Sequence, residues 1–181
     1  MIFTLRELFD VVVMTLAVGY IFMGVFKTHA IGFDRHTFLL ACLVTAPALI
    51  LHELAHKFVA IGFGLQADFH AAYFWLILGV VLRLLRSNFI FFVPAYVSFG
   101  SAIVQTTPLM SSAIAFSGPL MNLVLFGISW ALLRQKKMKH STFAFLYITK
   151  QINLFLFVFN MLPIPGFDGL KVYQGLYQTF F

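Results

Sequence analysis

The chain has 181 residues, of which 61% are hydrophobic and only 10% are charged, and its formal net charge is +6 at pH 7. Soluble globular domains are about half apolar and about a quarter charged, so this composition excludes an ordinary soluble protein and indicates an integral membrane protein. The basic residues stand at the ends of hydrophobic runs, which favours contact with lipid headgroups and argues against nucleic-acid binding.

Four hydrophobic runs have the length and composition of membrane spans: residues 11–26, 37–63, 109–133 and 143–162. The first run has no clear small-residue cleavage site after it, so we expect a retained span rather than a cleaved signal peptide.

The segment between the second and third spans has a different pattern. Residues 71–85 are apolar but fall short of the roughly 20 residues that a span needs. Residues 89–100 are rich in aromatic and β-branched side chains and contain Pro94, which favours an edge strand or loop. We therefore predict an all-α polytopic membrane protein: a single domain, residues 1–181, with about four transmembrane helices and a re-entrant or strand-like hairpin. It is either complete or a truncated six-helix core.

The second span contains the sequence His52-Glu53-Leu54-Ala55-His56. Helical spacing puts His52 and His56 on one face, about 6 Å apart along the axis, which suits two nitrogen ligands of one zinc ion. Glu53 is rotated off that face and is expected to accept a proton from a water on the metal. The alternative is a pair of core histidines that hydrogen-bond to neighbours, but ionisable groups in an apolar span are costly unless they have a function.

A catalytic zinc takes three protein ligands and a water, so one more ligand is needed. The best candidate is Asp168, which lies in a Pro- and Gly-rich break after the last span, because broken helices at membrane depth line cavities or are buried in protein. The two histidines and Asp168 all lie near the C-terminal ends of their spans. They meet only if both spans run in the same direction, which requires an odd number of membrane crossings between the two spans. The other acidic residues outside the histidine motif are Glu7, Asp10, Asp34 and Asp68.

Further polar residues lie within the predicted spans. The same topology places Asn122, in the sequence Gly118-Pro119-Leu120-Met121-Asn122, on the side of the membrane where the site lies. There it is expected to donate a hydrogen bond to a substrate oxyanion, and loss of one such donor costs ~3 kcal/mol. The alternative for Asn122 is a purely structural interhelical hydrogen bond. Lys57 is expected to extend toward the headgroups. Three residues of the last span are expected to face the interior or a water path: Lys150, Gln151 and Asn153.

With HELAH in one span, GPLMN in another and NMLPIPGFDG at the end of a third, the chain resembles the site-2 protease family of intramembrane zinc metalloproteases, peptidase family M50. The resemblance covers residues 52–169 in order and spacing. It implies a zinc-dependent endopeptidase that hydrolyses peptide bonds in or near transmembrane segments of membrane-protein substrates. It also implies one zinc per chain and these site residues: His52, His56 and Asp168 as ligands, Glu53 as general base and Asn122 assisting near the substrate carbonyl.

The resemblance further implies a multi-pass protein of the cell membrane whose site opens toward the cytosol. The positive-inside rule favours the reverse orientation, because more basic residues are expected on the side opposite the site than on its own side. Those on the opposite side are Lys27, Arg35, Arg134, Lys136, Lys137 and Lys139; those on the site side are Arg6, Lys57 and Lys171, with Arg83 and Arg86 if the hairpin lies there.

Two other classes of function stay open at this point. One is a zinc-binding membrane escort protein without protease activity. The other is a metal transporter in which His52, His56 and Asp168 form a transit site. A transporter needs a continuous polar path, and the few intramembrane charges argue against one.

Overall fold

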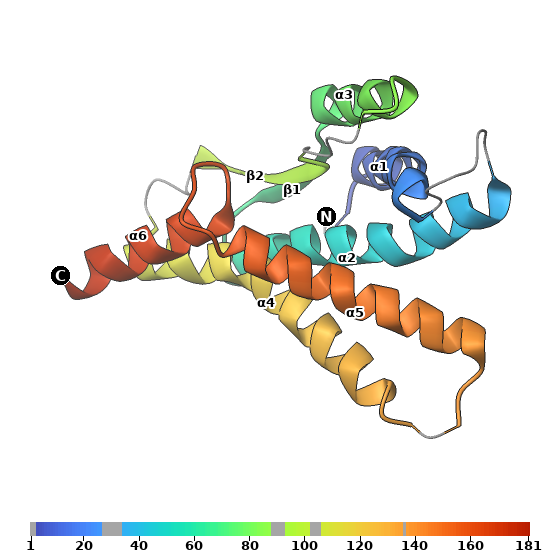
Figure 1. Ribbon diagram of the computed structural model, residues 1–181. Helices are drawn as coiled ribbons and strands as arrows, with labels where there is room; N and C mark the ends of the chain where they lie inside the picture. The colour runs from blue at the N-terminus through green and yellow to red at the C-terminus, as the bar shows by residue number, and fades with distance from the viewer. Residues whose placement is uncertain (1–2, 27–33, 88–92, 102–105, 136) are drawn as a thin grey trace. The chain divides into compact units, whose positions relative to one another are not determined.

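The computed structural model describes residues 3–26, 34–87, 93–101, 106–135 and 137–181. In that part of the chain, α1, α2, α4 and α5 are long and apolar enough to cross a membrane, which confirms the predicted polytopic fold with its four spans. The elements, shown in Figure 1, are α1 (Leu5–Phe26), α2 (Arg35–Gly62), β1 (Ala67–Ala71), α3 (Tyr73–Leu84), β2 (Ala95–Phe99), α4 (Pro108–Leu132), α5 (His140–Asn160) and α6 (Asp168–Phe180).

Three spans, α1, α2 and α4, begin at hydrogen-bonded caps, and at α2 the Asp34 carboxylate accepts from the Thr37 N–H. At the start of α1, the Glu7 carboxylate accepts from the Thr4 backbone N–H at 2.8 Å, and Thr4 Oγ1 accepts from the Glu7 N–H at 3.2 Å. This reciprocal capping box starts the helix at Leu5, earlier than the predicted residue 11. At the start of α4, Thr107 Oγ1 accepts from the Met110 N–H at 3.2 Å, and Pro108 occupies the first turn, where its missing N–H is no loss.

The strand-like part of the predicted hairpin is present as β2, which pairs with β1 in a sheet of two strands within the described residues. Strand β2 falls inside the predicted residues 89–100, of which 89–92 lie outside the described residues. Strand β1 was not predicted from the sequence. Its five residues alternate between buried and more exposed positions. Between the two strands, residues 71–85, which are apolar but too short for a span, contain the helix α3.

The backbone contacts divide the chain into two compact units. Unit 1 comprises residues 1–50 and 69–96, and unit 2 comprises residues 51–68 and 97–181. The expectation of a single domain stays a prediction. In unit 1, α1 packs along α3. The buried core of unit 1 consists of Met14, Val18, Phe69, Ala71, Leu76 and Ala95.

In unit 2, α4 lies beside α5 and also packs against α6 (Figure 1). Helix α6 comes close to α4 at Gly175, where an added Cβ would lie 2.5 Å from the Pro108 carbonyl oxygen. Ser112 Oγ donates to the carbonyl oxygen of Val172 at 3.0 Å in the same contact. In sequence, α4 is the single candidate span between α2 and α5 in the described chain, which is the odd number that the topology argument requires.

Helices α1 and α2 pack closely within unit 1 at a small residue, and this contact gives the first prediction. A Cβ added to Gly19 would lie 2.1 Å from Cys42 Sγ. Because close helix packing depends on small side chains, Gly19→Ala is expected to destabilise the protein by about 1–3 kcal/mol. Thermal unfolding of the detergent-solubilised protein measures this loss.

The matched control for Gly19→Ala is the double variant Gly19→Ala, Cys42→Ala, in which the sulfur that meets the new methyl group is absent. Most of the lost stability should return in the double variant. A double variant as unstable as the single one would contradict the assignment of the clash to Cys42.

Candidate metal centre

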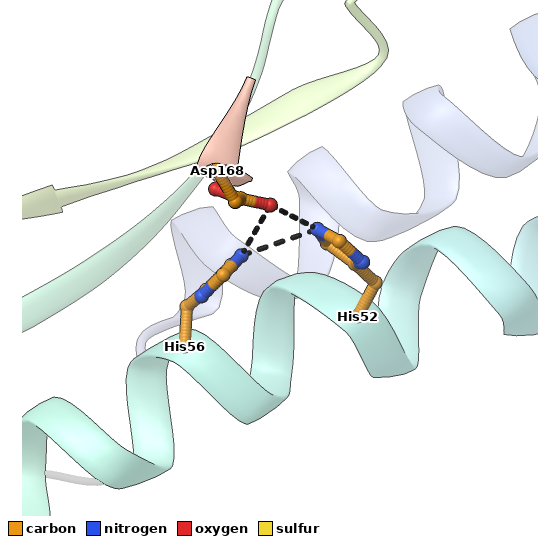
Figure 2. Close-up of side chains that lie close together, drawn as sticks. All are labelled: His52, His56 and Asp168. Atoms are coloured by element: carbon orange, nitrogen blue, oxygen red, sulfur yellow. Dashed lines mark hydrogen bonds and ion pairs between the residues drawn. The ribbon is translucent and has the colours of Figure 1, made fainter. Parts of the chain in front are cut away.

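Helix α2 places the rings of His52 and His56 side by side, one helical turn apart. Both residues are buried, at 5% and 6% exposure. Their Nε2 atoms lie 3.1 Å apart, and the rings meet edge to face with centroids 4.8 Å apart (Figure 2). Both imidazoles therefore direct their Nε2 atoms toward the same point.

The carboxylate of Asp168 completes this group from the first residue of α6. Its Oδ2 lies 3.1 Å from His52 Nε2 and 3.3 Å from His56 Nε2. The preceding turn contains Gly166 at φ +96°, a conformation that favours glycine. A Cβ added to Gly169 would lie 2.5 Å from the carbonyl of Met161, so the start of α6 approaches the end of α5 as closely as the backbone allows.

The donor set fits a zinc ion. Nitrogen and oxygen ligands at about 2.0–2.1 Å in tetrahedral geometry lie about 3.3 Å from one another. The three contacts among His52, His56 and Asp168 measure 3.1 to 3.3 Å. Two imidazoles and one carboxylate also form a common catalytic zinc set, which leaves a fourth position for water or substrate.

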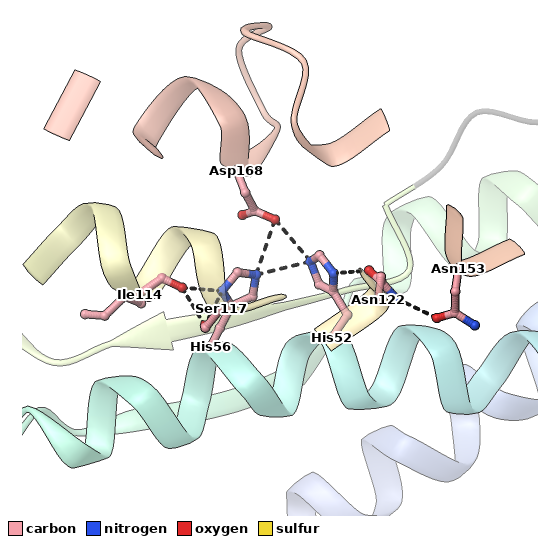
Figure 3. Close-up of polar contacts among 7 residues, drawn as sticks. All are labelled: His52, His56, Ile114, Ser117, Asn122, Asn153 and Asp168. Carbon is pink, nitrogen blue, oxygen red and sulfur yellow. Dashed lines mark hydrogen bonds and ion pairs between the residues drawn. The ribbon is translucent and has the colours of Figure 1, made fainter. Parts of the chain in front are cut away.

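The ring of His52 is oriented by a chain of buried amides from α4 and α5 (Figure 3). Asn122 Nδ2 donates to Asn153 Oδ1 at 3.0 Å, so Asn122 Oδ1 faces His52 and accepts from its Nδ1–H at 2.6 Å. Asn153 in turn donates to the Thr149 carbonyl oxygen at 2.8 Å. Because Nδ1 carries the proton, the lone pair of His52 lies on Nε2, toward the site.

His56 is oriented from α4 in the same way. Its Nδ1–H donates to the Ile114 carbonyl oxygen at 2.7 Å (Figure 3). Ser117 Oγ donates to that same oxygen at 2.7 Å and lies 3.3 Å from His56 Nδ1. The lone pair of His56 is therefore also on Nε2.

The backbone of α4 passes directly beside the two ligand nitrogens at Gly118. A Cβ added there would lie 2.3 Å from His56 Nε2 and 2.6 Å from His52 Nε2. This explains the glycine of the GPLMN motif, because any side chain at this position would occupy the space that the ligands need.

The structure separates Asp168 from the other acidic candidates. Glu7 and Asp10 accept from backbone N–H groups of residues 69 and 71, and Asp34 accepts from the Thr37 N–H. Asp68 is exposed. In the described residues, the group able to share one metal ion consists of His52, His56 and Asp168.

Electrostatics favour an ionised Asp168. Burial acts to raise its pKa, but a proton shared from Nε2 of His52 or His56 outweighs burial and holds the pKa below its usual range. The side chain is 21% exposed, so it is not sealed from outside. An ionised carboxylate at position 168 is the form that binds a cation.

Glu53 lies in α2 between the two histidines in sequence and is half-buried.

Among the residues that orient the two rings, only Asn122 received a role from the sequence. Asn153 faces the interior as predicted, at 0% exposure, and its amide is part of the chain that holds His52. Gln151 is exposed, so it does not face the interior, and its alternative placement on a water path stays a prediction. The prediction for Lys57 is wrong, because its side chain is 1% exposed and does not extend outward. A polar residue deep in an apolar span was the signal for Asn153, whereas nothing local identifies the Ile114 carbonyl.

Comparison with known proteins points to one family. Residues 128–181 match peptidase family M50. A protein of Methanocaldococcus jannaschii named "Putative zinc metalloprotease MJ0611" is 33% identical over 173 residues, which are 94% of this chain and 84% of that protein. No solved structure matches the chain.

The close approach of Gly118 predicts that a single methyl group impairs the site. Gly118→Ala is expected to weaken zinc binding by about tenfold or more, because the ligand nitrogens must move away from the new Cβ. Competition with a zinc-binding dye measures the affinity. Gly127→Ala is the matched control in the same helix, since a Cβ there has nothing within 4 Å. Equal zinc affinity in the two variants would contradict the assigned role of Gly118.

The amide chain predicts a second loss of metal affinity. Asn122→Leu removes the acceptor of His52 Nδ1–H, so zinc binding is expected to weaken about 10- to 100-fold. Asn122→Asp keeps an acceptor oxygen in the same place and should retain more affinity than the leucine variant. The same dye competition gives both values, and a leucine variant with wild-type affinity would show that Asn122 does not orient His52.

Proposed function

The chain belongs to peptidase family M50, the site-2 proteases, and from this premise we propose that it is an intramembrane zinc endopeptidase. Its substrates are transmembrane segments of other membrane proteins, or the residues next to them. The observation that carries the proposal is the convergence of His52, His56 and Asp168 in helices of a protein with four candidate spans. A hydrolytic site built into apolar helices suits substrates that lie in the same bilayer.

His52, His56 and Asp168 hold the zinc ion in this proposal. Bound zinc would supply a Lewis acid that polarises the scissile carbonyl and lowers the pKa of a water molecule toward ~7. His52 and His56 contribute neutral nitrogens whose orientation is fixed through their Nδ1 contacts. Asp168 contributes a negative charge from the start of α6.

Glu53 acts as the general base. It follows His52 directly in α2 and is rotated by about 100° from it, so it stands beside the ligand face without belonging to it. It accepts the proton of the attacking water and returns it to the leaving amine. The oxyanion role of Asn122 stays a prediction, since its amide already contacts His52 and Asn153.

A helical substrate hides its backbone amides, so it must be extended before cleavage. The edge of a sheet holds an extended peptide by strand addition, in which backbone hydrogen bonds give affinity. We assign this task to β2, the strand-like element expected from residues 89–100. The partners of the protein are then a transmembrane protein or peptide and the lipid bilayer.

We further propose that the protein resides in the cell membrane with its site toward the cytosol. The family resemblance supports this orientation, while the distribution of lysine and arginine favours the reverse. Cysteine accessibility in intact cells, measured in a Cys42→Ala background with a new cysteine at Lys137, tests the proposal. Labelling from outside supports the proposed orientation, and labelling only after cell lysis contradicts it.

Substitution of Glu53 tests the mechanism. Glu53→Gln is expected to bind zinc like the wild type but to lose cleavage by about 10²–10⁴-fold, because an amide does not accept the proton. Zinc content by elemental analysis and cleavage of a transmembrane protein substrate in detergent are measured together.

Asp168→Ala is the companion to Glu53→Gln and should lose both zinc and cleavage, because a ligand is absent. Two results would contradict the assignments. Substantial cleavage by Glu53→Gln would remove Glu53 as the base, and full zinc in Asp168→Ala would place the third ligand elsewhere.

A further inference from the structure

Helix α1 carries two buried carboxylates that the proposed reaction does not use. Glu7 is 2% exposed and Asp10 is 0% exposed. Carboxylates within an apolar helix are expensive unless they have partners, so their contacts indicate what they do.

Both carboxylates accept hydrogen bonds from the backbone of β1, within unit 1. Glu7 Oε1 accepts from the Phe69 N–H at 2.7 Å, and Asp10 Oδ2 accepts from the Ala71 N–H at 3.3 Å. Asp10 Oδ1 also accepts from the Tyr73 hydroxyl. Phe69 and Ala71 are 0% and 3% exposed, so without these acceptors their N–H groups would be buried and unsatisfied.

The register of the sheet shows which edge of β1 these contacts occupy. The Ala72 N–H donates to the Pro94 carbonyl oxygen at 3.1 Å, and the Gly100 N–H donates to the Gln66 carbonyl oxygen at 2.9 Å, which makes the strands antiparallel. His70 and Tyr96 face each other across this register, with ring centroids 5.4 Å apart. Even-numbered residues of β1 thus pair with β2, and Phe69 and Ala71 direct their N–H groups to the other edge.

The same register gives β2 an edge of its own. Its odd-numbered residues, Ala95, Val97 and Phe99, direct their backbone N–H and C=O groups away from β1. In the described part of the chain the sheet has two strands, so no described strand pairs with this edge of β2. Val97 and Phe99 pack against the buried cluster that contains Ile114, whose carbonyl oxygen accepts from His56.

We propose that Glu7 and Asp10 are positioning residues that close the outer edge of β1 and so direct an extended substrate segment to the outer edge of β2. The inference rests on the proposed function. Charged groups on a sheet edge prevent further strand pairing, and here they occupy the very N–H groups that a peptide would need. Charge-assisted hydrogen bonds are also stronger than neutral ones, so they fix β1 and the register of its partner.

The test uses the full chain, loaded with zinc, in detergent micelles. The probe is a synthetic Leu/Ala transmembrane peptide of about 24 residues with a central Asn-Pro pair, which spans the bilayer and unwinds at its centre. Glu7→Leu and Asp10→Leu remove the acceptors, whereas Glu7→Gln and Asp10→Asn keep an oxygen for the strand N–H. Thr4→Val is the matched control, because it disturbs the cap of α1 and leaves the Glu7 contact with Phe69 in place.

Amide hydrogen exchange at Phe69 and Ala71 reads the contact directly. Exchange is expected to be about tenfold faster or more in the leucine variants, since a lost hydrogen bond of this kind shifts local opening by that order. The amide variants and Thr4→Val should exchange like the wild type. Unchanged exchange in both leucine variants would overturn the proposal at its first step.

The KM and kcat of cleavage then measure how well the substrate docks. The leucine variants should raise KM about tenfold with kcat within about twofold and zinc content unchanged, and the amide variants should restore KM. Faster exchange with unchanged KM would overturn the link to substrate binding. An equal rise of KM in Thr4→Val would overturn it as well.

Failure of the wild type to cleave any transmembrane substrate would overturn the proposed function together with the docking role. The exchange rates would still decide whether the carboxylates hold β1.

Discussion

Two histidines one turn apart bind the same ion only when each ring directs an unprotonated nitrogen at it, and much of unit 2 serves this requirement. In each ring the Nδ1 proton is donated to an oxygen of the surrounding helices: the Asn122 side chain for His52 and the Ile114 carbonyl for His56. An imidazole whose Nδ1–H is held in this way keeps its lone pair on Nε2 and loses its freedom to rotate. The protein therefore sets both the tautomer and the direction of the two ligands.

Space for these ligands comes from small residues at the helix contacts. Gly118 lets α4 pass beside the two Nε2 atoms, Gly169 lets α6 start against the end of α5, and Gly175 lets α6 lie on α4. In a membrane, helices associate through close packing rather than through a hydrophobic driving force, and small residues permit the closest approach. The glycines of GPLMN and PGFDG thus act on the same centre from different helices, and Asp168 reaches the histidines because all three contacts are tight.

Those parts of the fold that depend on local pattern were predictable from the sequence. The four apolar runs, the helical spacing of His52 and His56 and the broken helix before Asp168 can each be recognised from one continuous stretch of sequence. Strand β1 was not predicted, because a five-residue strand is held by partners distant in sequence. The two carboxylates that hold it lie more than 60 residues away in α1, and only the Thr4-x-x-Glu7 spacing marked the true start of that helix.

Buried carboxylates occur both at the sheet and at the metal centre, and their partners distinguish the two uses. Glu7 and Asp10 accept hydrogen bonds from backbone N–H groups, which are permanent donors that no metal displaces. Asp168 instead faces Nε2 of His52 and Nε2 of His56, and both nitrogens carry a lone pair when the proton is on Nδ1. All three groups are then hydrogen-bond acceptors. Three acceptors at 3.1 to 3.3 Å from one another repel unless a cation or a shared proton lies among them. The same rule of satisfying every buried polar group therefore separates the two carboxylates at the sheet, which backbone donors satisfy, from Asp168, which is the candidate ligand of a cation.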